Sequence, residues 1–301
     1  MNLNSIVIKS DEVSLALPMV SDIVEINRGG FKIVYSAKIK NKKEALKLVL
    51  IPAVPQGQEQ LRYECLGRVK REINVLANCK RPEIVKLGTL APTEITINGH
   101  TFIAYSEEFL EGKTLLEIVN DQNAQNPNWP ELKTLTILLL KAIQELWAHK
   151  IIHRDIKPGN VMRLADSRRL YVLLDLGIAF SIAETHLTVL PEQRQPIGTW
   201  RYMAPEMLRQ NFRDTVSFRS DLYTMGQTVF EYAAKIHPLA RNSDDLFQTV
   251  TRIVSQEPKQ LIDLRPDLPK AFCSLIDQTM KKIPALRPGN IENLIQTVED
   301  L

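Results

Sequence analysis

The sequence predicts an α+β fold, in which a small β-rich part precedes a larger and mainly helical part. Two observations support this prediction. Before about residue 112, short runs of β-branched and aliphatic residues are separated by turn formers, whereas after it apolar residues recur at helical spacing. The 301 residues are 44% hydrophobic and 24% charged, which is ordinary for a protein that buries a sizeable core.

The β-rich part contains two clear strand pairs and one helix. Strands are predicted at residues 32–39 (KIVYSAKI) and 44–51 (EALKLVLI), with Asn41 in the turn between them. The pair Asn98–Gly99 lies between two further apolar runs, which is a strong signal for a β-hairpin. Apolar residues spaced by three and four positions predict a helix over residues 59–78.

The second part reads as a series of helices around one short strand. Residues 130–150 open with Pro130 and carry the broad apolar face of a buried helix. A turn at residues 167–169 is expected to lead into the stretch 171–177 (YVLLDLG), which predicts an apolar strand that ends in Asp175. Further helices are predicted at residues 219–234, 244–256, 270–282 and 290–300.

Residues 1–20 carry only a weak signal. The stretch 5–17 (SIVIKSDEVSLAL) alternates loosely between apolar and polar residues. We therefore expect it either to add a strand to the β-rich part or to bind a partner.

Composition and charge argue against several classes of protein. A net charge of +3 gives no reason to expect binding to nucleic acid or to a membrane surface. No apolar run approaches the roughly 18 residues of a membrane span, and the N-terminus lacks the features of a signal peptide. The cysteines, Cys65, Cys79 and Cys273, are widely spaced, which favours a reduced chain over a disulfide framework. These observations predict a cytoplasmic protein and leave its oligomeric state open.

One loop, IIHRDIKPGNV (151–161), carries more polar residue types than a turn requires. A turn before the strand at 171–177 would bring Asp175 back beside this loop. Asp175 and Asn160 would then offer the hard oxygen ligands that Mg²⁺ prefers. Asp155 would be left to orient or deprotonate an attacking hydroxyl, and Lys157 would offset charge on a transferring phosphoryl group.

These motifs resemble those of the eukaryotic-type (Hanks-type) serine/threonine protein kinases. HRDIKPGN is similar to the catalytic loop, DLG (175–177) to the metal-binding motif, and GTWRYMAPE (198–206) to the end of the activation segment. Lys157 and Thr199 mark the serine/threonine branch. The resemblance runs from about residue 22 to the end. It implies a bilobal protein-kinase-like fold filling residues 1–301, with an N-lobe at 1–108 and a C-lobe at 109–301.

The resemblance also implies a set of functional residues, carried over position by position. The cofactors it implies are ATP and Mg²⁺, with Mn²⁺ as a possible substitute, and the partners are protein substrates with serine or threonine acceptors. In this reading Lys47 pairs the α- and β-phosphates and Glu72 holds that lysine. The implied catalytic residues are Asp155, Lys157 and Asn160, and the implied metal ligands are Asn160 and Asp175. The residues implied to bind the nucleotide are Asn27, Gly29, Val34, Ala45, Lys47, Glu72, Glu108, Leu110, Met162 and Asp175.

Structural residues are implied in the same way. Asp221 resembles the helix aspartate that accepts hydrogen bonds from the catalytic-loop backbone. Glu206 and Arg287 resemble an ion pair of the large lobe.

The chain departs from the family at two places near the nucleotide. The phosphate-covering hairpin has Asn27, Gly29 and Lys32 where the family pattern has three glycines. Glu107 stands where the family normally has an apolar residue or threonine at the back of the adenine pocket. Either the alignment is wrong by one residue there, or Glu107 is a carboxylate that competes for Lys47 or narrows the pocket.

Regulation and activity each leave alternatives. Arg154 would bind an acidic group in the activation segment, and either Glu192 or phosphorylated Thr188 would supply it. The leading hypothesis for the function is an active serine/threonine protein kinase. The alternatives are a pseudokinase-like nucleotide-binding module, suggested by Asn27, Lys32 and Glu107, and a small-molecule kinase of related fold.

Overall fold

The computed structural model describes residues 3, 6–29, 31–51, 53, 59–175, 200–209 and 215–301. The described residues fall into two compact units. The first contains the chain up to Cys79 and Val85–Leu110, and the second contains Lys80–Ile84, Glu111–Asp175 and the described part of Ile197–Leu301. The expected division between residues 108 and 109 stays a prediction. Eight side chains within these ranges are not described: Glu59, Leu61, Glu64, Cys65, Arg68, Arg71, Glu72 and Ser167.

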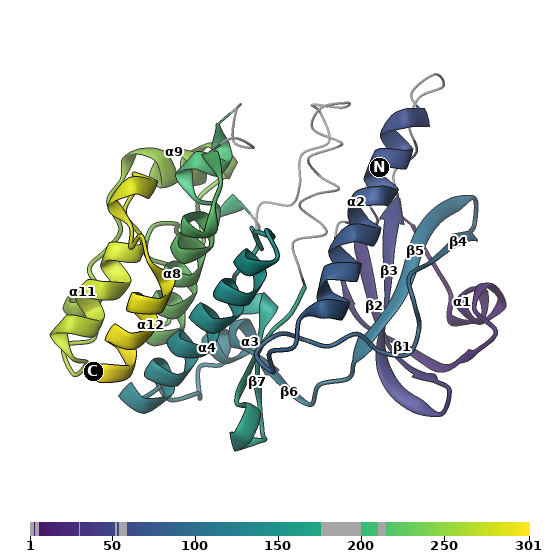
Figure 1. Ribbon diagram of the computed structural model, residues 1–301, viewed down its shortest axis with the longest axis horizontal. Helices are drawn as coiled ribbons and strands as arrows, with labels where there is room; N and C mark the ends of the chain where they lie inside the picture. Colours follow the sequence, from purple (N-terminus) through teal and green to yellow (C-terminus); the bar gives the residue numbers. More distant parts are fainter. Residues whose placement is uncertain are drawn as a thin grey trace. The chain divides into compact units, whose positions relative to one another are not determined.

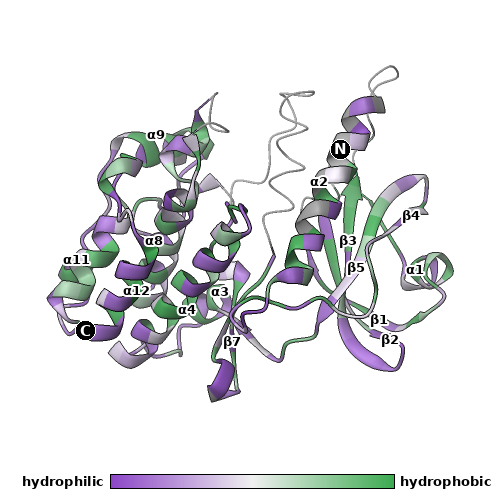
Figure 2. Cartoon of the chain, viewed as in Figure 1, coloured by the Kyte–Doolittle hydropathy of each residue, from purple (hydrophilic) through white to green (hydrophobic). Residues whose placement is uncertain are grey.

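The first unit is built on a five-stranded antiparallel sheet with the order β1-β2-β3-β5-β4 (Figure 1). Two of its hairpins turn through two residues with positive φ, Lys40 and Asn41 in one and Asn98 and Gly99 in the other, as tight β-hairpins require. The lysine-rich turn between β2 and β3 is hydrophilic (purple in Figure 2). Both predicted strands and the predicted hairpin are confirmed. The strands are β1 (Val20–Arg28), β2 (Lys32–Ile39), β3 (Lys42–Ile51), β4 (Thr93–Ile97) and β5 (His100–Glu108).

The central strands β3 and β5 have buried side chains on both faces of the sheet, since successive side chains alternate between the faces. On one face, Val49 of β3 and Tyr105 of β5 pack with Val69 and Ile73 of the helix α2 (Glu59–Asn78), which has the predicted bounds. On the other face, Leu48 and its even-numbered neighbours in β3 pack against the N-terminal segment of the chain. Figure 1 shows α2 and the short helix α1 on opposite sides of the sheet.

The N-terminal segment forms a helix, α1 (Ser10–Ala16), so the expectation of a strand was wrong. The side chain of Glu12 accepts the backbone N–H of Lys9 at 2.8 Å, which closes the first turn. Val13 and Leu17, four residues apart on one face, are buried against the sheet. A helix of seven residues, in which polar residues separate the apolar ones, is too short to show a clear period. Partner binding by this segment stays a prediction.

The second unit is mainly helical, as predicted, with a small three-stranded sheet in the order β6-β7-β8. The helices predicted around residues 130–150, 219–234, 244–256, 270–282 and 290–300 are all present. The strands are β6 (Gly112–Thr114), β7 (Val161–Leu164) and β8 (Tyr171–Leu173). The helices are α3 (Leu115–Asn120), α4 (Trp129–Ala148), α8 (Phe218–Ala234), α9 (Leu246–Ser255), α10 (Leu261–Leu264), α11 (Lys270–Thr279) and α12 (Ile291–Asp300).

Helix α8 is the core of the second unit, because its residues from Ser220 to Ala233 are all buried. Gly226 lets α11 approach closely, since a Cβ at this position would lie 2.1 Å from Oγ1 of Thr279. None of the helices in the described ranges combines the length and apolar character that crossing a membrane would demand.

The strand predicted at residues 171–177 is shorter than expected. β8 ends at Leu173, and Asp175 has a φ of 54°, which lies in the left-handed region and not in a strand. The predicted turn before it is confirmed as a 3₁₀ helix at Ser167–Arg169. The apolar run continued past the point where the backbone changes direction, so composition alone placed the strand end too late.

Candidate active site

The loop after α4 is held through its backbone by Asp221, in the first turn of α8. The N–H groups of His153 and Arg154 donate to the two carboxylate oxygens of Asp221, each at 2.8 Å. The predicted hydrogen bonds are therefore confirmed. Asp221 is only 1% exposed, and burial raises its pKa to about 7, while the two backbone hydrogen bonds oppose that rise. Arg154 has a φ of 65°, an unusual value for a non-glycine residue that this clamp stabilises.

His153 links the loop to the residues that follow β8. Its Nδ1 accepts the N–H of Asp155 at 3.3 Å, and its Nε2 lies 3.1 Å from the carbonyl oxygen of Leu174. Both contacts fit a neutral imidazole that carries its proton on Nε2. Burial lowers the pKa of His153, so the ring stays neutral and serves as a fixed hydrogen-bonding bridge.

Three polar side chains of the loop contact one another directly. Nζ of Lys157 lies 2.9 and 2.8 Å from the two carboxylate oxygens of Asp155. Nδ2 of Asn160 donates to the carbonyl oxygen and to Oδ2 of Asp155, both at 2.8 Å. The Asp155 side chain is 14% exposed and so stays accessible from solvent. Because the amide nitrogen of Asn160 faces Asp155, its amide oxygen is directed away, where it is suited to binding a hard cation.

Asp175 lies next to a residue that is anchored to the same loop. The N–H of Leu174 donates to the carbonyl oxygen of Asn160 at 2.8 Å. The chain then turns at Asp175, whose positive φ ends the run of β8. The structure thus brings Asp155, Lys157 and Asn160 into contact, and it attaches Asp175 to them through the backbone of its neighbour.

One supporting residue, Thr228, was not found by sequence reasoning. Its hydroxyl lies 3.3 Å from the carbonyl oxygen of Ile156, within the loop, and 2.8 Å from that of Thr224. Thr228 follows Asp221 by seven residues on α8 and therefore lies on the same helix face. The signal was present in that spacing, but it can be used only once the loop is known to pack along α8.

In the first unit, the strand register places the predicted nucleotide-binding residues of β2 and β3 on one face. Val34 pairs with Lys47, Lys47 with Tyr105, and Ala45 with Glu107. Residues directly opposite in neighbouring strands point to the same side of a sheet. All five side chains therefore lie on the face that α2 covers, since Tyr105 packs there.

The register also bears on the two interpretations of Glu107. The Glu107 carboxylate contacts Nζ of Lys47, and the two side chains are only 3% and 5% exposed. Ser106 points to the opposite face, where its hydroxyl donates to Oε2 of Glu44 at 2.6 Å. Residues one place away from Glu107 therefore cannot line the Lys47 side. The geometry favours the interpretation that Glu107 is a carboxylate directed at Lys47.

The hairpin that was predicted to cover the phosphates has Gly29 at a position where the described residues do not require a glycine. Asn27 pairs with Val34, and the N–H of Gly29 donates to the carbonyl oxygen of Lys32 at 2.8 Å. A Cβ at Gly29 would meet only that carbonyl within 4 Å, at 3.8 Å, which is an ordinary contact. Neither packing among the described residues nor a positive φ calls for glycine here.

The remaining predicted nucleotide contacts lie near the ends of strands. Glu108 ends β5, and its N–H donates to the carbonyl oxygen of Lys86 at 2.9 Å. Leu110 follows it and is partly buried. Met162 is on β7, opposite Val172 of β8, and is also partly buried.

Comparison with known proteins decides the family. The sequence profile of the protein kinase domain matches residues 20–298. The chain belongs to the protein kinase domain family. The expected fold class is confirmed with it, since a β-sheet unit and a helical unit are both present.

Curated relatives of this kinase domain are longer proteins. A probable serine/threonine-protein kinase PknB of Lactococcus lactis subsp. lactis is 28% identical over 276 residues, which cover 92% of this chain and 41% of that protein. The serine/threonine-protein kinase PknH of Mycobacterium tuberculosis is 26% identical over 269 residues, which cover 89% of this chain and 40% of that protein. The chain therefore spans about two fifths of the length of these relatives.

A solved structure shares the fold of this kinase domain. The crystal structure of Rad53 1-466 in complex with AMP-PNP matches with a TM-score of 0.68 at 21% sequence identity. The match covers 92% of this chain and 64% of that one.

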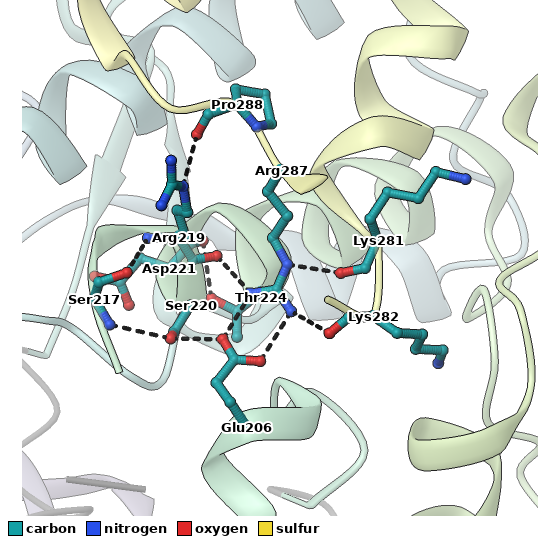
Figure 3. A network of polar contacts seen from close by, with 10 residues as sticks. All are labelled: Glu206, Ser217, Arg219, Ser220, Asp221, Thr224, Lys281, Lys282, Arg287 and Pro288. Carbon is teal, nitrogen blue, oxygen red and sulfur yellow. Dashed lines mark hydrogen bonds and ion pairs between the residues drawn. The ribbon is translucent and has the colours of Figure 1, made fainter. Parts of the chain in front are cut away.

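The kinase domain also contains the predicted buried ion pair of its helical unit (Figure 3). The two terminal guanidinium nitrogens of Arg287 bind Glu206, at 2.6 and 2.9 Å, and neither side chain is more than 1% exposed. Ser220 donates a further hydrogen bond to Glu206 at 2.7 Å. The other donors of Arg287 reach backbone carbonyls of Arg219, Lys281 and Lys282. This predicted ion pair is confirmed.

Several predicted residues lie outside the described part of the chain. Thr188, Glu192 and Thr199 belong to the activation segment, whose residues 176–199 are not described. The alternatives for regulation therefore stay predictions. Glu72 lies on α2, but its side chain is among those not described, so its predicted pairing with Lys47 also stays a prediction.

Proposed function

We propose that this kinase domain transfers the γ-phosphate of ATP to serine and threonine hydroxyls of protein substrates. The arrangement around Asp155 carries the proposal. A partly exposed carboxylate is held by Lys157 and Asn160, on a loop whose backbone is clamped to α8. The relatives PknB and PknH, named as serine/threonine-protein kinases, support the same assignment.

Asp155 would orient the acceptor hydroxyl and take its proton as the oxygen bonds to phosphorus and ADP leaves. Lys157, in contact with both carboxylate oxygens, would offset negative charge on the transferring group. Asp221 and His153 would act through position, because they fix the backbone N–H groups of residues 153–155. Most of the catalytic effect would then come from positioning and electrostatics.

Asn160 and Asp175 fit a divalent cation. They offer an amide and a carboxylate oxygen, which are hard ligands suited to Mg²⁺ or Mn²⁺, and Asn160 turns its amide nitrogen to Asp155. When bound, such a cation neutralises charge on the nucleotide phosphates.

The sheet of the first unit supplies most of the proposed nucleotide contacts. Lys47 would bind the α- and β-phosphates. Gly29 would leave room for phosphate to approach the backbone, since no described neighbour requires a glycine at this position. The other contacts are proposed at Asn27, Val34, Ala45, Glu108, Leu110 and Met162, with Glu72 acting on Lys47. The fold relative Rad53 was determined in complex with AMP-PNP, which supports a nucleotide site. A cytoplasmic location is proposed with this function.

Phosphate transfer to a generic acceptor protein tests the proposal. The purified chain is incubated with radiolabelled ATP, Mg²⁺ and casein, and the labelled amino acids are identified. We expect phosphoserine and phosphothreonine from the wild type and from the control Asp166→Asn, whose exposed carboxylate binds its neighbour Arg168. Asp155→Ala should lose the transfer. Equal labelling by Asp155→Ala, or binding of nucleotide without any transfer, would contradict the proposal and favour a pseudokinase-like module.

A further inference from the structure

Two oppositely charged side chains are buried together on the α2-covered face of the first unit. The Glu107 carboxylate contacts Nζ of Lys47, with 3% and 5% of the side chains exposed. A charge removed from water to this extent needs a counter-charge, because its desolvation costs several kcal/mol. The contact is therefore a specific feature of the folded chain and not a loose surface pair.

The sheet itself fixes the position of this carboxylate. β3 and β5 are hydrogen-bonded in one unbroken register from Glu44 opposite Glu108 to Ile51 opposite Thr101. Glu107 is one step diagonal from Lys47 on the same face, a separation that long side chains bridge. A carboxylate on α2 would have its distance from Lys47 set in another way. Side-chain packing joins that helix to the sheet, whereas backbone hydrogen bonds join β3 to β5.

The other carboxylates at this end of β3 and β5 are committed elsewhere. Glu44 lies on the opposite face, where Ser106 and Thr89 donate to its Oε2. Glu108 lies on that face too and accepts the N–H of Lys86 at 2.8 Å. Of the described carboxylates in these two strands, Glu107 is the one directed to Lys47.

We propose that Glu107 is the carboxylate that positions Lys47 for the phosphates of the nucleotide. This inference rests on the proposed function, which gives Lys47 its ligand. It assigns to a strand residue the role that family resemblance gives to Glu72. Because the register of β3 and β5 sets the contact, Lys47 is held in place whatever the position of α2. An ammonium group has three donors, so it can bind Glu107 and a phosphate oxygen at once.

The test compares Glu107→Gln with Glu72→Gln, which remove one negative charge each and keep the side-chain shape. Glu94→Gln is the matched control, because Glu94 belongs to the same sheet and forms an exposed pair with Arg62. The measurements are the affinity for ADP by calorimetry, and KM for ATP and kcat by phosphate transfer. We expect Glu107→Gln to weaken ADP binding and raise KM by at least about 10-fold, corresponding to one charge-assisted contact of about 1.4 kcal/mol. Glu72→Gln should change them less, and Glu94→Gln should change neither.

Coupling to Lys47 separates positioning from a purely structural role. In a Lys47→Met background, Glu107→Met should leave ADP affinity unchanged, since the residue it positions is gone. It should also raise the melting temperature by removing a buried carboxylate that has lost its contact with Lys47. If Glu107→Gln does not fold, Glu107→Asp takes its place, and its shorter reach should still raise KM.

Three results would overturn the inference. They are unchanged nucleotide affinity in a folded Glu107 variant, a larger loss in Glu72→Gln than in Glu107→Gln, and tighter binding in Glu107→Gln, which would mean that Glu107 withholds Lys47 from the nucleotide. Failure of the proposed function gives a different pattern: ADP affinities follow the expected order, but the wild type transfers no phosphate.

Discussion

Each unit of this kinase domain buries an ion pair, and the two pairs are built differently. Arg287 donates two parallel hydrogen bonds to Glu206, and its remaining donors bind backbone carbonyl oxygens of three residues. Lys47 meets Glu107 with a compact ammonium group at the end of a flexible stem. A planar guanidinium locked by five or more contacts has one arrangement, whereas an ammonium can turn toward a new acceptor.

The difference indicates what each pair is for. The Glu206–Arg287 pair ties the Pro205–Leu208 turn to α8 and to the chain after α11, so its value is structural (Figure 3). The Lys47–Glu107 pair lies on the same face of the sheet as the proposed nucleotide contacts Val34 and Ala45. A buried charge that can change partners is suited to binding a ligand.

The largest expected effect tests the structural pair. Arg287→Met should lower the free energy of unfolding by about 3–5 kcal/mol, because it leaves Glu206 buried without its counter-charge. Urea denaturation followed by circular dichroism measures this loss. Glu206→Gln in the same chain should restore part of it. A loss below about 1 kcal/mol would show that the pair does not hold the unit together.

A smaller effect concerns a buried group that is kept neutral. Burial, and then the charge of Arg201, lower the pKa of His237 well below its usual value. Its Nδ1 accepts the N–H groups of Leu239 and Ala240, at 3.1 and 2.8 Å. The unfolded chain takes up this proton as the pH falls through about 6.5, while the folded chain does not, so stability falls with pH.

The pH prediction is measured as a difference between two proteins. Between pH 6.5 and 5.5, the wild type should lose about 1 kcal/mol more stability than His237→Asn, whose amide oxygen can replace Nδ1 as the acceptor. Subtracting the variant cancels the contributions of His153 and Asp221, whose pKa values shift in opposite directions. Parallel pH profiles would contradict the assignment of His237 as a buried neutral group.

The smallest expected effect concerns an exposed ion pair, which serves as a comparison for the two buried pairs. Arg62 and Glu94 approach to 2.7 Å, but 37% and 39% of their side chains are exposed. Glu94→Gln should change the free energy of unfolding by no more than about 1 kcal/mol, because water screens the pair. A cost near that of Arg287→Met would show that burial is not what separates these pairs.

Most helices and strands, and the polar residues of the loop at 151–161, could be predicted from the sequence, because both depend on residues that are close together in the chain. Periodicity located α2 to the residue, and Asn98–Gly99 located a hairpin. The mutual contacts of Asp155, Lys157 and Asn160 follow from their offsets within one turn.

The missed features depend on packing between distant segments. α1 has too few residues to show a period, and its burial depends on a sheet face that the sequence does not display. Thr228 became part of the site only when the loop was seen to run along α8. The Glu107 contact required the register of β3 against β5, in which a shift of one residue would turn the carboxylate to the other face.

The single-turnover rate of Asp155→Asn at saturating ATP and Mg²⁺ tests the central claim most directly, because it separates chemistry from binding. Asn keeps the size of the side chain but cannot accept the proton of the substrate hydroxyl. We predict a rate at least about 100-fold below that of the wild type, with ADP affinity unchanged. A rate within a few-fold of the wild type would contradict the role of Asp155 in phosphate transfer.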